Sequence, residues 1–158
     1  MGKLQRRLEG GLTLYVRQMA WLHATPKPDE RSRRGKAESD APRRSRIDAL
    51  KRKKIDPQMP PNPAPHITTW LIEIGLSEAA AAAGMGAAPL SSREIAAWQD
   101  NTCIRLEPWV ARLLRKLSAA YLAEGRRAEA ETCPPPWRAP VSQRELEVAE
   151  AELRNVLG

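Results

Sequence analysis

The chain of 158 residues has no phenylalanine, two tyrosines, two histidines and two cysteines. Cys103 and Cys133 are 30 residues apart, with no further cysteine or histidine cluster to complete a tetrahedral metal site. The uncharged stretch 79–92 is alanine-rich and is interrupted by glycine and proline, which excludes a membrane span there. We therefore expect a soluble, reduced cytosolic protein without a metal.

What is abundant is basic charge, proline and helix-favouring residues. Residues 27–54 hold twelve lysines and arginines against five acids, which accounts for the whole net charge of +7. The large apolar residues are mainly leucine, alanine and five tryptophans, which favour helices over strands. The composition therefore predicts an all-α protein whose basicity belongs to one segment.

The first sixty-five residues divide into two predicted regions. In residues 1–24, leucines and other large residues recur at steps of three and four, which predicts an amphipathic helix. It is expected to pack on the main domain or on another copy. Residues 25–65 combine high charge and many prolines with few apolar residues, so we predict a disordered basic linker.

The second half of the chain predicts a small three-helix domain over residues 66–132. The first helix is expected to run from Thr68 or Thr69 to Ala83 and to end at Gly84. The second covers 92–100, after a capping box formed by Ser91 and Glu94, and the third covers 108–125.

The last region, 133–158, begins with a proline-rich stop in which Trp137 is expected to fold back. Ser142 and Glu145 form a second capping box and begin an amphipathic helix. A helix of this length is marginal alone in water, so we predict that it docks on another surface.

The pattern offers no catalytic residues, and no cofactor is implied. No phosphate-binding loop, HExxH sequence or Cys–His pair is present. The basic segment offers anion contacts, with a solvated tether as the simpler interpretation. These contacts would be Arg43, Arg44, Arg46, Lys51, Arg52, Lys53 and Lys54.

The candidates for binding a protein partner are tryptophans, cations and stripe leucines. Tryptophan and arginine dominate binding hot spots, although packing in the small core is the simpler interpretation of Trp98. The candidates are Trp98, Trp109, Arg112, Lys116, Leu146 and Leu153.

Residues 67–137 contain a recurring pattern of small, apolar and capping residues around two tryptophans. Its members are Gly84, Met85, Gly86, Pro89, Leu90, Ser91, Glu94, Ile95, Ala97, Trp98, Leu106, Pro108, Trp109, Leu113, Leu117, Tyr121 and Leu122. With these residues the segment resembles a family, the small tail assembly chaperones of long-tailed, siphovirus-like bacteriophages. The chain departs from the family pattern at Val110, where an acid is common, and at 101–103, where Leu-Thr-Gly is commoner.

The resemblance implies a non-enzymatic protein of the host cytoplasm that binds the tape-measure protein, and other tail components, during tail assembly. The sequence also leaves self-association open. Nucleic-acid binding is expected to be weak and non-specific, and no membrane contact is expected. Two alternatives are a helix-turn-helix-like DNA-binding phage regulator and a minor virion structural protein. The start of the third helix offers poor base-reading chemistry for the first alternative.

Overall fold

The computed structural model describes residues 2–29, 31, 42–79 and 86–158, and these residues are mainly helical. The predicted all-α class is confirmed, with a single two-stranded antiparallel sheet added in the described part. The elements are α1 Lys3–His23, α3 Arg46–Arg52, α4 Pro65–Ile74, β1 Glu78–Ala79, β2 Ala87–Ala88, α5 Ser92–Thr102, α6 Pro108–Arg127 and α7 Gln143–Leu157.

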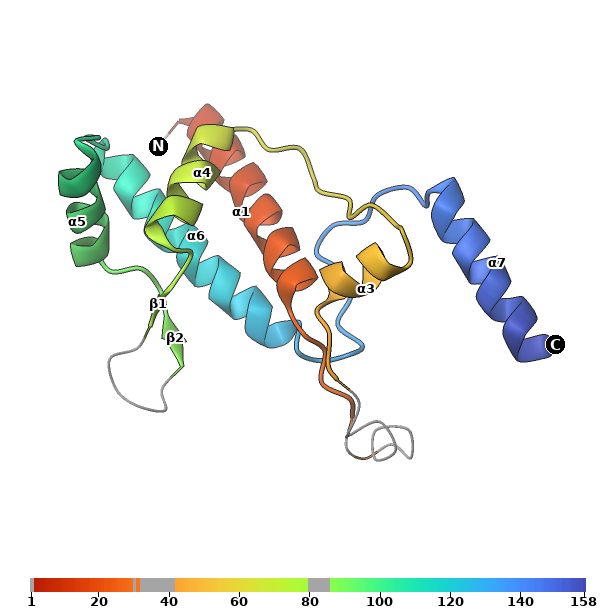
Figure 1. The fold of residues 1–158 in the computed structure, drawn as a ribbon. Helices are drawn as coiled ribbons and strands as arrows, with labels where there is room; N and C mark the ends of the chain where they lie inside the picture. Colours follow the sequence, from red (N-terminus) through yellow and green to blue (C-terminus); the bar gives the residue numbers. More distant parts are fainter. Residues whose placement is uncertain (1, 30, 32–41, 80–85) are drawn as a thin grey trace.

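The two long helices, α1 and α6, lie side by side at the centre of the fold (Figure 1). Leu12 and Val16 of α1 are completely buried, as are Leu114 and Leu117 of α6. The contact of α6 with α1 is far more extensive than its contacts with α4 and α5. The predicted packing of the N-terminal helix on the main domain is therefore confirmed, and this helix is a fourth member of the core beside the three that the sequence predicted.

The first predicted helix of the core domain is shorter than expected. α4 ends at Ile74 because Gly75 adopts a left-handed conformation with φ of 114° and donates its N–H to the carbonyl of Leu71. The expected continuation to Ala83 is wrong, since the chain enters β1, which pairs with β2. Gly84 and Met85 lie outside the described residues. A left-handed glycine cap has ended the helix before the alanine run.

A buried hydroxyl joins this connection to α6. Ser118 is completely buried, accepts a hydrogen bond from the N–H of Leu90 at 2.9 Å and donates to the carbonyl of Leu76 at 2.7 Å. Two backbone groups that flank the small sheet are thereby satisfied inside the protein.

The helices α5 and α6 begin where the sequence predicts. The hydroxyl of Ser91 accepts the N–H of Glu94 at 3.2 Å, and Pro108 occupies the first turn of α6. α5 ends at Thr102, because the next residue, Cys103, is left-handed with φ of 56°. The side chain of Gln99 accepts the N–H of Leu106 at 2.8 Å. These local contacts fix the short connection between the two helices.

The prediction of a disordered linker is wrong for residues 42–65. This part contains α3, capped by Ser45, and Ile55 is buried. The guanidinium of Arg46 explains the order, since it binds the carbonyls of Ala128, Ala130 and Trp21 at 2.6, 3.0 and 3.3 Å. Polar contacts to the ends of α1 and α6 add to the few apolar anchors of the segment, Ile55 and Ala64, which are buried. Residues 30 and 32–41 of the predicted linker lie outside the described ones.

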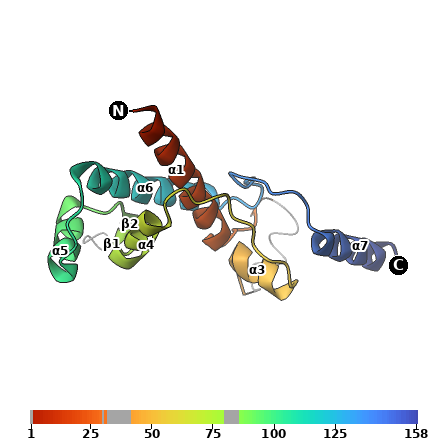
Figure 2. The same ribbon diagram turned by 90° about the horizontal axis from the view of Figure 1, so that it is seen from above.

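The C-terminal region combines a confirmed and a wrong prediction. Trp137 folds back, since its N–H donates to Gln18 on α1 at 3.2 Å, and the capping box of Ser142 and Glu145 is present. The expected docking of the last helix is wrong, because no residue of α7 is buried. Both views show α7 standing apart from α4, α5 and α6 (Figures 1 and 2). Polar contacts to Lys53 hold α7 in this position and leave its apolar side exposed.

Candidate partner-binding surfaces

Trp98 is placed in the core. Its side chain is 9% exposed, and its ring lies 6.2 Å from that of Trp70 on α4. His66 contacts the same Trp70 edge-on at 5.2 Å. Trp98 therefore joins α5 to α4, which leaves little of its ring for a partner.

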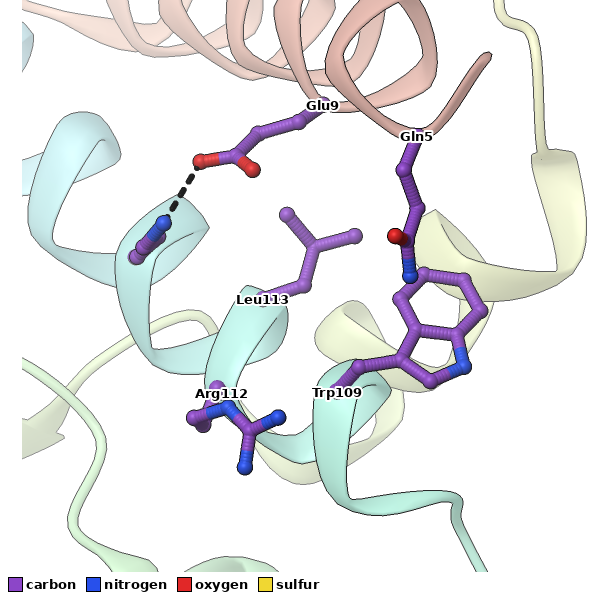
Figure 3. Close-up of a pocket in the computed structure, with 6 residues that line it drawn as sticks. Gln5, Glu9, Trp109, Arg112 and Leu113 are labelled. Atoms are coloured by element: carbon purple, nitrogen blue, oxygen red, sulfur yellow. Dashed lines mark hydrogen bonds and ion pairs between the residues drawn. The ribbon is translucent and has the colours of Figure 1, made fainter. Parts of the chain in front are cut away.

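A hollow of about 320 Å³ lies between the N-terminal parts of α1 and α6 (Figure 3). Trp109, Arg112 and Lys116 come from one face of α6, because steps of three and four residues return to the same side of a helix. Gln5 and Glu9 of α1 form the opposite wall, and Leu113 lies between the two helices. The sequence candidates on α6 are thus brought together.

The charges around this hollow are partly neutralised. Lys116 forms an ion pair with Glu9 at 2.8 Å, and the indole N–H of Trp109 donates to the carboxylate of Glu107. Trp109 is half-buried against the core, while Arg112 is exposed. The arrangement has an apolar floor with a cationic rim, which suits an apolar side chain of a partner better than a reacting group.

The second surface is the outward stripe of α7, defined here as Leu146, Ala149, Leu153, Val156 and Leu157. At 3.6 residues per turn these five side chains fall within an arc of about 100°. Leu146 and Leu153 are 54% and 57% exposed, and Val156 and Leu157 exceed 80%. Contiguous exposed apolar side chains on a helix typically mark an interaction site.

The anchoring of α7 leaves this stripe uncovered. Lys53 binds Glu152 at 2.6 Å, and its carbonyl accepts two hydrogen bonds from Arg144 at 3.2 and 3.3 Å. Arg144 and Glu152 both lie outside the stripe on the helix surface. The charged contacts thus orient the helix without covering its leucines.

The predicted anion contacts do not form one site. Arg46 is turned inward, lies over the ring of Trp21 at 4.5 Å and is not available to a phosphate. Desolvation lowers the pKa of Arg46, against an opposing contribution from Cys133. Lys53 is occupied by Glu152. The remaining candidates are exposed on the surface, namely Arg43, Arg44, Lys51, Arg52 and Lys54.

A buried acid at the end of α6 was not predicted. Glu124 is 4% exposed, its Oε2 accepts the Nε–H of Arg17 at 3.1 Å, and its Oε1 lies 3.4 Å from the guanidinium of Arg127 without hydrogen-bond geometry. The only signal in the sequence is an arginine that interrupts the apolar pattern of the first helix. This cluster joins α1 to α6, so it supports the fold and not a site.

Within the described residues, no group of three or more histidine, cysteine, aspartate or glutamate side chains could hold a metal ion. No helix in that part of the chain combines the length and apolar character needed to cross a bilayer. No protein family model, curated protein or solved structure matches the chain.

Proposed function

We propose that this protein is a non-enzymatic partner-binding protein of the tail assembly chaperone type, which covers apolar helical segments of a tape-measure protein in the host cytoplasm. The observation that carries the proposal is the outward stripe of α7, with Leu146 and Leu153 more than half exposed. An apolar helix face of this kind binds another amphipathic helix by packing side chains three and four residues apart.

The hollow beside Trp109 supplies a second contact for the same partner. A tryptophan with a neighbouring arginine is a frequent source of binding energy at protein interfaces. The resemblance of residues 67–137 to the chaperone family includes Trp109 and the start of its helix. Support for the DNA-binding alternative is weaker, because Lys116 is paired with Glu9 and Trp109 is half-buried.

Co-expression with the cognate tape-measure protein tests the proposal. The soluble fraction of the partner should rise, and the two proteins should copurify. Replacing both Leu146 and Leu153 by alanine should lower copurification about tenfold or more, since each leucine contributes roughly 1.5 kcal/mol when buried. Ile72→Ala is the matched control, because Ile72 is 54% exposed on α4.

Trp109→Ala forms a second arm of the same experiment. It should weaken copurification while the helical circular-dichroism signal stays largely intact, because the ring is only half-buried. Leu113→Asp should lower both the copurification and the helical signal, since it places a charge in the core at a side chain that is 4% exposed. A tape-measure protein that is equally soluble with and without this chain would refute the proposed function.

A further inference from the structure

We infer that the outward stripe of α7 binds a basic amphipathic helix, that is, one whose apolar stripe is bordered by lysine or arginine. This inference rests on the proposed function, because it names the chemistry of the partner segment. The borders of the stripe consist mainly of glutamates.

The glutamates lie on both sides of the stripe. At about 100° per residue, Glu145 and Glu152 follow on one border and Glu147 and Glu150 on the other. Arg154 is the only base near a border, and it pairs with Glu150 at 3.4 Å. Glu147 pairs with Arg144 at 3.4 Å and Glu152 with Lys53 at 2.6 Å. All of these side chains are about half exposed or more, and exposed ion pairs contribute little, so a partner's cations can compete for the glutamates. Opposite charges along the edges of a helix–helix contact set partner choice and orientation. The charge pattern of α7 therefore selects positive flanks.

Pairing with α7 of a second copy is disfavoured by the same charges. If Leu146 and Leu153 occupy the a positions of a heptad, Glu145 and Glu150 occupy the g and e positions. A parallel pair would place Glu145 opposite Glu150, and an antiparallel pair would place Glu145 opposite Glu152. Like charges across such a contact are destabilising, so a basic partner is favoured over a second copy. An anionic lipid surface is disfavoured for the same reason.

The rest of the described chain offers no suitable occupant. Leu4 of α1 is 81% exposed and has basic neighbours, but the next residue of its stripe, Leu8, packs against the core. α3 has only seven residues, whereas α7 has fifteen and is about 22 Å long. No helix among the described residues therefore fits the stripe, and the occupant that we assign is a helix of another protein.

A pair of synthetic peptides tests the inference on the full-length chain by calorimetric titration. Both peptides carry leucine at the a and d positions of about three heptads, one with lysine and the other with glutamate at e and g. The lysine peptide should bind at least about tenfold more tightly, and its affinity should fall as salt is raised. Equal binding of both peptides, or binding of neither, would overturn the inference.

Variants of α7 test the two parts of the recognition separately. Replacing Leu146 and Leu153 by alanine should abolish binding of the lysine peptide and, with it, the difference in affinity between the two peptides. Glu147→Lys/Glu150→Lys should weaken binding of the lysine peptide about tenfold and strengthen binding of the glutamate peptide. Glu131→Lys is the control for net charge, since Glu131 is exposed and lies outside α7.

The remaining outcomes separate this inference from the proposed function. If the tape-measure protein copurifies but the peptides show no charge preference, the inference fails and the proposed function stands. If the lysine peptide binds with the expected preference while the tape-measure protein does not copurify, the proposed function fails and the inference stands. A dimer that Leu153→Ala dissociates, or binding of the chain to anionic vesicles through α7, would also overturn the basic-helix assignment.

Discussion

At the scale of single residues, Arg46 orders a segment that has few apolar anchors. Its guanidinium binds three carbonyls and lies over the ring of Trp21. Carbonyls in the last turn of a helix have no intrahelical partner, so a forked donor beside two helix ends satisfies several at once. The side chain that the sequence suggested as an anion contact is therefore structural.

We expect Arg46→Ala to lower the free energy of unfolding by about 2 kcal/mol, because hydrogen bonds from a charged donor to three carbonyls are lost, and two of these bonds are partly buried. Arg46→Lys should restore only part of this, since an ammonium cannot replace the planar fork. Urea denaturation measures the change. Arg44→Ala serves as the control, because Arg44 is exposed, and an equal loss there would contradict the structural role of Arg46.

At the scale of elements, local signals were predictable and tertiary partners were not. Ser91 begins its helix by accepting the backbone N–H three residues further on, and Ser142 does the same. The whole signal for these two helix starts therefore lies in four consecutive residues of the sequence. Gly75 is also a local signal for a helix end, although the alanine run beyond it favours a longer helix. The partner of α1 depends on residues about one hundred positions away, which periodicity cannot identify.

In the candidate site, too, the residues of one helix were predictable from local spacing, whereas the contacts between helices were not. The helical spacing of Trp109, Arg112 and Lys116 predicts a shared face, and the structure confirms it. The opposite wall of the hollow comes from Gln5 and Glu9, which no pattern near α6 indicates. Likewise, the stripe of α7 was predictable, but its exposure was not, because an amphipathic pattern does not say whether its apolar side is covered.

Removing whole elements should separate α1 from α7. Deletion of residues 2–24 exposes Leu114 and Leu117, so we expect loss of the cooperative thermal transition. Deletion of residues 141–158 removes no buried side chain of α7, so the melting temperature should shift by only about 2 °C or less. Circular dichroism on both truncations measures this. A large drop in melting temperature after the second deletion would show that α7 docks after all.

At the scale of the whole molecule, opposite charges lie in different parts of the structure. The helices α1, α4, α5 and α6 form the packed body, while α3 and the basic residues around it lie on the side where α7 is held (Figures 1 and 2). The contact between Lys53 and Glu152 joins the basic segment to the acidic helix. A nucleic acid approaching the basic segment therefore also meets the carboxylates of α7.

This arrangement predicts weak, sequence-independent DNA binding. With Arg46 turned inward and Lys53 paired, five of the seven predicted anion contacts remain exposed. If about five cations neutralise phosphates, the affinity should fall several-hundredfold between about 0.05 and 0.2 M salt. Lys51→Glu/Arg52→Glu should weaken binding equally for all sequences, whereas Arg105→Glu, at an exposed position outside the basic segment, should change it little. Electrophoretic mobility shifts over a salt series measure both effects. A footprint on one defined sequence that survives about 0.2 M salt would instead support a DNA-reading role for the helices α5 and α6, because phosphate contacts alone carry no sequence information.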